Sequence, residues 1–169
     1  MKKIHVLLVL VIFWSCNIAQ AQNSIEKNDI EIKGIKLGMI RSEAEMLLGT
    51  ESNVKPFTIA GIPSKKYGIT SKFIDDKLSE FGFYFNPTFF PLMLSAVKEK
   101  YPELTCETSE VKNRMGATFE QKNCAIKSNS GNFKMSKYFY DLNTSSLRMT
   151  SVEQEEKYIL EMKKQKKDI

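Results

Sequence analysis

The chain has 169 residues, with 25 lysines and arginines against 20 aspartates and glutamates, and a single histidine. The net charge of +5 is too small to indicate nucleic acid as a partner. The histidine, His5, lies in the N-terminal leader described next, so the chain that follows this leader has no Ser-His or Cys-His catalysis and no histidine metal site.

The N-terminus has the pattern of a secretory signal peptide. Two lysines precede an apolar run over residues 4–14, and Ala19-Gln20-Ala21 supplies the small residues that a signal peptidase reads. The run is shorter than the ~20 apolar residues of a bilayer span, so we expect no transmembrane span. Cleavage near Ala21 predicts a periplasmic or secreted protein. The alternative is a protein that is lipid-anchored through Cys16.

The sequence divides into four parts. Residues 1–21 are predicted to be the signal peptide and residues 22–29 a flexible leader. Residues 30–152 have the length of a single domain with one hydrophobic core, and residues 153–169 are predicted to form a C-terminal charged helix.

The first predicted helix starts at Ser42. Ser42 and Glu45 have the spacing of a capping box, in which each side chain binds the other residue's backbone amide, and Gly49 has the position of a helix end. A short strand around residues 30–32 precedes the helix. The buried side of the helix is predicted to consist of Ala44, Leu47 and Leu48.

The segment from Gly38 to Gly49 resembles the signature of the SmpA/OmlA family (BamE-type), which are small envelope lipoproteins of outer-membrane assembly, and of relatives with the β-lactamase-inhibitor-protein-like fold. The family tends to read Gly-Met-Thr, then Gln or Glu followed by Val, then Leu-Leu-Gly. The resemblance implies a small exported module of helices on an antiparallel sheet that binds other proteins and has no catalytic residues. The matching residues are Gly38, Met39, Glu43, Leu47, Leu48 and Gly49, whereas Ile40, Ala44 and Glu51 depart from the pattern.

A second helix is predicted in the middle of the chain, from Asn86 to Tyr101. Asn86 can cap its start, Pro87 suits the first helical position, and Pro102 ends it. Strands are predicted before and after it from alternating apolar residues and turn signals. The helix stripe is Phe90, Met93, Leu94, Val97 and Tyr101, and the strands are residues 57–60, 69–74, 78–85, 104–108, 117–127, 133–140 and 147–152.

Two cysteines remain after cleavage near Ala21, Cys106 and Cys124, and in an exported protein we expect them to form a disulfide. Phe119 and Cys124 differ in strand parity, however. Either a bulge lies near residues 121–123, or Cys124 faces outward. A disulfide favours the bulge or a twisted edge.

The predicted fold class is α+β, with helices packed on one face of an antiparallel sheet. The order of the elements suggests two helix–three-strand units in tandem. Ser151 and Gln154 form a second capping box at the start of the tail helix, whose acids lie near its N-terminus and whose lysines lie near its C-terminus. Its apolar stripe is thin, so we expect loose docking.

Carboxylates are the remaining candidates for acid-base chemistry. Three clusters exist: Asp75 with Asp76, Glu43 with Glu45, and the glutamates at residues 153–156. Each has a local structural role in a turn or at a helix start, so we expect no catalytic residue, no metal ligand set and no cofactor.

A protein-binding patch is the strongest functional prediction. If Phe133, Met135 and Phe139 face inward, the next residues along the strand face outward, where Tyr84 and Arg148 of other strands join them. Tyrosine and arginine are enriched in protein interfaces. The predicted patch consists of Tyr84, Tyr138, Tyr140 and Arg148. The alternative is that the tail helix covers this face.

The sequence therefore favours an exported, non-enzymatic protein-binding module of the bacterial cell envelope. Its expected partner is another envelope or secreted protein, and not nucleic acid. The alternatives are an inhibitor or immunity protein and a carboxylate-based cell-wall hydrolase. The sequence does not indicate an oligomeric state.

Overall fold

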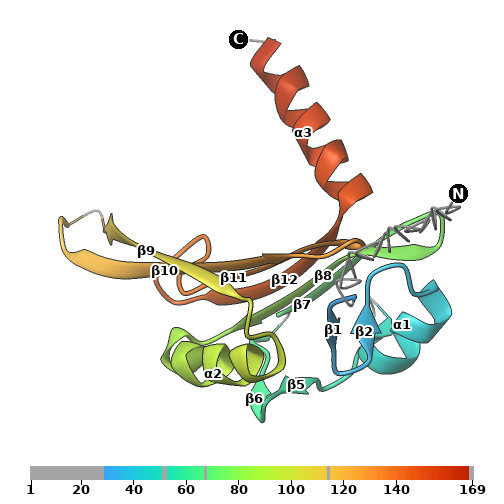
Figure 1. The fold of residues 1–169 in the computed structure, drawn as a ribbon, viewed down its shortest axis with the longest axis horizontal. Coiled ribbons are helices and arrows are strands. Elements are labelled where there is room, and N and C mark those ends of the chain that lie inside the picture. Colours follow the sequence, from blue (N-terminus) through green and yellow to red (C-terminus); the bar gives the residue numbers. More distant parts are fainter. Residues whose placement is uncertain (1–28, 51–52, 67, 114, 168–169) are drawn as a thin grey trace, which may run out of the picture.

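The computed structural model describes residues 29–50, 53–66, 68–113 and 115–167, so the predicted signal peptide and Cys16 lie outside the described residues. An antiparallel sheet of six strands, in the order β7-β8-β12-β11-β10-β9, forms the centre of the fold (Figure 1). The predicted α+β class is confirmed. The strands are β7 (Ile69–Ile74), β8 (Lys77–Phe85), β9 (Thr105–Lys112), β10 (Thr118–Lys127), β11 (Gly131–Ser136) and β12 (Ser145–Ser151).

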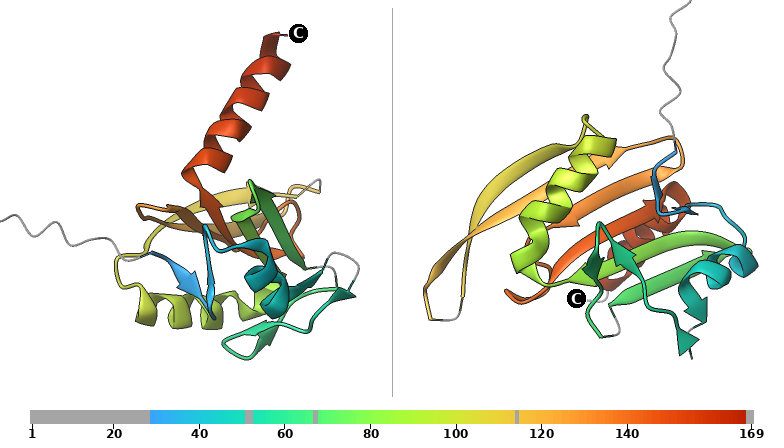
Figure 2. Two further views of the ribbon diagram at one scale, coloured as in Figure 1. Left: turned by 90° about the vertical axis from the view of Figure 1, so that its right-hand side faces the viewer. Right: turned by 90° about the horizontal axis from the view of Figure 1, so that it is seen from below.

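Two helices and three small ribbons cover one face of this sheet, here called the inner face, and the third helix rises from the outer face (Figures 1 and 2). The helices are α1 (Arg41–Leu48), α2 (Phe90–Lys100) and α3 (Val152–Lys167), with a 3-10 turn η1 (Pro87–Phe89) before α2. The ribbons are β1 (Glu31–Ile32) with β2 (Ile35–Lys36), β3 (Gly49–Thr50) with β4 (Asn53–Val54), and β5 (Thr58–Ile59) with β6 (Ile62–Pro63). Two strands of the main sheet follow α1 and four follow α2, so the two predicted units are unequal.

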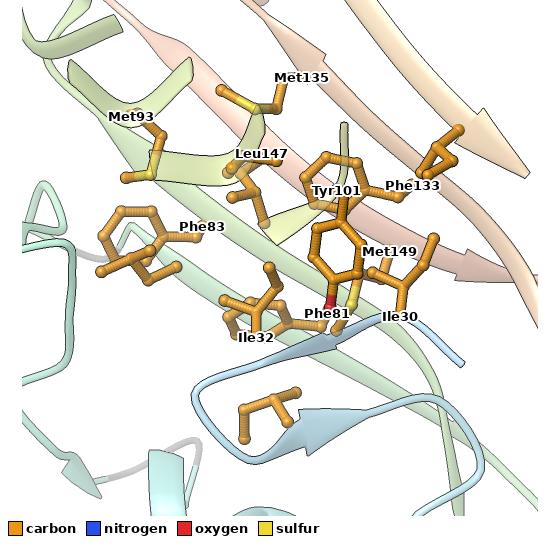
Figure 3. Close-up of a cluster of buried hydrophobic side chains, with 14 of the residues drawn as sticks. Ile30, Ile32, Phe81, Phe83, Met93, Tyr101, Phe133, Met135, Leu147 and Met149 are labelled. Atoms are coloured by element: carbon orange, nitrogen blue, oxygen red, sulfur yellow. The ribbon is translucent and has the colours of Figure 1, made fainter. Parts of the chain in front are cut away.

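The core lies between the inner face and α2. Side chains alternate along a strand, so every second residue of β8, β11 and β12 points into this core (Figure 3). α2 presents its predicted stripe to them, and Asn86 caps η1 by accepting a hydrogen bond from the Thr88 amide at 3.0 Å. The buried core residues include Phe81, Phe83, Phe85, Met93, Val97, Phe133, Met135, Leu147 and Met149.

The start of α1 differs from the prediction. Its N-cap is Ile40, which makes no side-chain cap, and Ser42 lies inside the helix, so the capping box of Ser42 and Glu45 is wrong. Ion pairs of Arg41 take the place of the capping box. The Arg41 guanidinium lies 2.8 Å from the Asp76 carboxylate and 3.9 Å from the Glu45 carboxylate. These ion pairs tie α1 to the β7–β8 turn.

The rest of α1 follows the sequence more closely. Gly49 ends the helix at a φ of 83°, as its residue type predicts. Ala44 and Leu48 are buried, whereas Leu47 is 41% exposed and was wrongly assigned to the core. With two turns, α1 has room for only two inward positions on this side.

The predicted disulfide joins Cys106 and Cys124, which are direct partners in the β9–β10 ladder. The register between these strands runs without a shift, and Cys124 is 1% exposed on the inner face. Both sequence explanations of the parity conflict, the bulge and the outward cysteine, are therefore wrong. Instead Phe119 lies on the outer face, where it meets Tyr138 edge to face at 6.2 Å.

Removing this disulfide should destabilise the protein without changing its fold. We expect replacement of Cys106 and Cys124 together by alanine to lower the free energy of unfolding by about 3 kcal/mol, because the bridge restricts the unfolded chain. Thermal melts should show a loss of roughly 6–12 °C. As a control, the wild-type protein alkylated without reductant should show no mass increase; two alkylated cysteines would contradict the bridge.

Strand β11 ends at Ser136, four residues before the predicted end at Tyr140. The chain then enters a loop over residues 137–144 that leads to β12. Phe139, which the alternation placed in the core, lies on the outer side instead, stacked on Tyr84 at 5.5 Å. This change brings the Phe139 ring to the outer face.

Candidate functional site

The outer faces of β7, β8 and β12 form the floor of the site. In the register of these strands, Thr70 lies opposite Gly82 and Gly82 opposite Arg148. Next to them Lys72 lies opposite Glu80. The register shifts at this point, because β8 has one extra residue, Ser79, against β7.

A groove of about 510 Å³ lies between this floor and α3. We call it the outer groove. Strands β7, β8 and β12 supply its floor, α3 supplies a wall and the 137–144 loop supplies one residue of its rim. Its lining residues are Thr70, Lys72, Glu80, Tyr84, Tyr140, Arg148, Tyr158, Glu161, Met162 and Gln165.

A buried carboxylate holds the floor and the helix together. Glu80 is 3% exposed, and its two oxygens lie 3.1 Å from the Arg148 guanidinium and 3.7 Å from the Lys72 ammonium. The Tyr158 hydroxyl of α3 donates a third contact to Glu80 and accepts one from Lys72. We call these four residues the ion cluster. A carboxylate removed from water needs such partners, so the cluster fixes the base of α3.

Further contacts of the first turns of α3 agree with this anchoring. The Gln154 amide donates to the Ser151 hydroxyl at 3.1 Å, which is half of the predicted capping box. The Gln154 side chain turns instead to Ser79, whose hydroxyl lies 3.3 Å away. Glu155 pairs with Lys134 of β11 at 3.1 Å. Only the first turns of α3 therefore dock, and the rest of the helix projects from the sheet (Figure 1).

Three aromatic residues, Tyr84, Phe139 and Tyr140, form what we call the aromatic cluster. Gly82 makes room for it: a Cβ at this position would lie 3.2 Å from the Tyr84 ring, so that ring lies over the glycine. Phe139 stacks on Tyr84, and the Phe139 and Tyr140 rings are 3.9 Å apart. The guanidinium of Arg148 lies 5.3 Å from the centre of the Phe139 ring, within the range of a cation–π contact.

Tyr140 is 90% exposed although it is held in place by its loop. Its φ of 64° is uncommon for a residue with a side chain and directs the ring away from the strand path. Hydrogen bonds from the Thr144 hydroxyl and the Asn143 amide lower the pKa of the neighbouring Asp141 carboxyl below its ordinary value. These bonds close the turn that follows Tyr140, whose ring faces solvent.

The structure thus brings together three of the four predicted patch residues, Tyr84, Tyr140 and Arg148. Tyr138 lies elsewhere on the outer face, over β10, where its backbone amide and carbonyl both bind the Gln121 side chain at 3.0 Å. The sequence prediction did not include Phe139, Lys72, Glu80 and Tyr158. The sign of the ion cluster in the sequence was Glu80, a charged residue in the largely apolar strand β8.

The ion cluster should make stability sensitive to alkali. Burial, and then the hydrogen bond to Glu80, raise the pKa of the Tyr158 hydroxyl, and the bond to Tyr158 raises the pKa of Lys72. A raised pKa in the folded state favours the protonated form. The two groups therefore contribute fully to the free energy of unfolding below their unfolded-state pKa values, which are about 10 for both. This contribution is lost as the pH rises through their folded-state pKa values.

We expect the melting temperature of the wild type to fall more between about pH 9 and about pH 11 than that of Tyr158→Phe, which removes one of these groups. Melts by circular dichroism across this range measure the difference. Tyr140→Phe, which removes an exposed hydroxyl outside the ion cluster, is the control. Parallel curves for the wild type and Tyr158→Phe would contradict the coupling.

Members of the three predicted carboxylate clusters come together at two places in the fold. Arg41 pairs with both Asp76 and Glu45, and Glu43 also lies on α1. Asp75 and Glu153 come from two different clusters and both line a depression of about 260 Å³ between the β7–β8 turn and the start of α3. Among the described residues, no three cysteine, aspartate or glutamate side chains gather in a way that could hold a metal ion.

The chain is thus a small α+β protein with an aromatic and ionic groove on the outer face of an antiparallel sheet. No protein-family model, curated protein or solved structure matches the chain. Within the described residues, every helix is too short or too polar to cross a membrane.

Proposed function

We propose that this chain is an exported, non-enzymatic protein-binding module of the bacterial cell envelope, and that the outer groove is its binding surface. The observation that carries the proposal is the exposed Tyr140 ring, held by its loop beside Phe139 and Tyr84 at the rim of the groove. Aromatic side chains fixed in this way contribute much buried area at little cost in conformational entropy.

The lining of the groove supports a protein segment as the ligand. Tyrosine and arginine in its lining are residue types enriched in interfaces, and polar side chains lie beside them.

Three features support the cellular setting. The N-terminal pattern is that of a signal peptide, with lipid attachment at Cys16 as the alternative to cleavage near Ala21. The disulfide fits an oxidising compartment outside the cytoplasm. The resemblance of residues 38–49 to the SmpA/OmlA family also favours an envelope partner.

Two other functions are the alternatives to this proposal. An inhibitor or immunity protein would use the same outer groove, with a tighter and more rigid contact. A cell-wall hydrolase would use Asp75 and Glu153 in their shared depression. Release of soluble fragments from purified cell wall by the wild type, and its loss in Asp75→Asn, would support the hydrolase and reject our proposal.

Site-specific photo-crosslinking tests the proposed function directly. A photoreactive phenylalanine analogue replaces Tyr140, or replaces Met115 as a control that is equally exposed, at 90%, on the β9–β10 hairpin. We expect one envelope protein to crosslink from position 140 in the producing cells and not from position 115. Equal crosslinking from both positions, or none from position 140, would reject the outer groove as the binding surface.

A further inference from the structure

α3 carries an exposed apolar stripe. Val152 is 49% exposed, Ile159 42% and Leu160 58%. At about 100° per residue, these three side chains lie along one side of the helix. Gln154 and Tyr158, which bind the sheet, lie on the other side. Figures 1 and 2 show this helix projecting away from the rest of the molecule.

Two opposite charges flank the stripe at nearly equal distances from its centre. Glu156 lies three residues before Ile159 and Lys163 four residues after it, and both are exposed. By helical periodicity both lie on the same side of α3 as Ile159. The surface is therefore acidic at one end, apolar in the middle and basic at the other end.

This arrangement is complementary to itself under a two-fold rotation. When two such helices run antiparallel and cross near Ile159, Glu156 of each faces Lys163 of the other, and the two isoleucines meet at the axis. A parallel pair would instead place like charges side by side. The helix dipoles also oppose each other in the antiparallel pair, which is the favourable alignment.

We propose that α3 binds α3 of a second copy of this chain, antiparallel, about a two-fold axis close to Ile159. The geometry of the molecule permits it. A helix of 16 residues is about 24 Å long, so the two domains lie at opposite ends of the helix pair. The outer groove remains open, because Tyr158 and Glu161 line it from a different side of α3. The pairing adds to the proposed function and does not depend on it.

The charge pattern favours a second copy over an anionic lipid surface. Glu153, Glu155 and Glu156 occupy the first turns of α3, and an anionic surface would repel them. A pair of short helices buries less than the ~1,200–2,000 Å² of a standard interface, so we expect a reversible dimer with a dissociation constant in the micromolar range.

Sedimentation equilibrium of the chain from Gln22 onward, over about 1–500 µM, tests the pairing. We expect a monomer–dimer equilibrium in the wild type. Glu156→Lys and Lys163→Glu should each weaken the dimer by about tenfold or more, because each variant brings two pairs of like charges together. The double variant with both changes should return to within about threefold of the wild type, because the opposite pairs are restored with reversed sign.

Recovery of the dimer in the double variant distinguishes this interface from any other contact between two copies. Circular dichroism confirms that the three variants keep the fold, which both exposed positions should permit. A wild type that stays monomeric would overturn the proposal, and so would single variants that dimerise normally or a double variant that is not rescued. Flotation with vesicles of anionic and neutral phospholipid provides the lipid test: binding by a monomeric wild type would replace the second copy with a membrane surface.

Discussion

Replacement of Arg148 with methionine is expected to lower the free energy of unfolding by about 3 kcal/mol. The change removes the closest cation from Glu80, a carboxylate that is 3% exposed, and leaves it with Lys72 and Tyr158 only. Denaturant unfolding measures the loss, which corresponds to a fall of roughly 6–12 °C in melting temperature.

Lys134→Met is the matched control, because Lys134 lies directly opposite Arg148 on β11 and pairs with Glu155 in a more exposed setting. An exposed pair of this kind contributes at most about 1 kcal/mol. The double variant Glu80→Leu with Arg148→Met should recover part of the stability, because no buried carboxylate then lacks its partner. Equal small losses in Arg148→Met and Lys134→Met would show that Glu80 is not held as described.

Tyr140→Ala is expected to weaken binding of the crosslinked partner by roughly 30-fold or more, the effect of truncating an aromatic anchor at the centre of an interface. The melting temperature should stay within about 2 °C of the wild type, because the ring is 90% exposed and little packing is lost. Isothermal titration calorimetry with the purified partner measures the affinity, and a thermal melt measures the stability.

Two further variants are compared with Tyr140→Ala. Met115→Ala truncates a side chain of the same exposure on the distant hairpin and should leave affinity unchanged. Tyr84→Ala should lower both affinity and stability, since Tyr84 packs over Gly82 and stacks on Phe139. If Tyr140→Ala bound the partner as tightly as the wild type, the aromatic cluster would not be part of the interface.

Local patterns predicted the elements that have one buried face. The alternating phenylalanines of β8 and the stripe of α2 were assigned correctly because burial on one side leaves a periodic trace in the sequence. The disulfide followed from the cysteine count and the export signal. These features depend on neighbours in the chain and on composition, which a single sequence records.

The errors occur where distant residues decide the outcome. Alternation continued through Phe139, yet the strand stops at Ser136 because Gln121 of β10 captures the Tyr138 backbone and turns the chain toward Tyr84. Arg41 and Asp76 likewise replace a local capping box by a contact across the fold. Three patch residues could be predicted from the sequence because they share one face of the sheet. Lys72 and Tyr158 could not, because their places in the groove depend on how β7 pairs and how α3 docks.

The position of β12 in the sheet has a consequence for how the chain folds. β12 is the last strand in the sequence, yet it lies between β8 and β11. An emerging chain therefore holds two separate antiparallel pieces, β7–β8 and β9–β11, each with a bare edge, until Ser145–Ser151 arrives to join them. Such late, long-range pairing slows folding. Chains truncated before this strand should be open to proteases and aggregation, because the six-stranded sheet is complete only when Ser145–Ser151 is present.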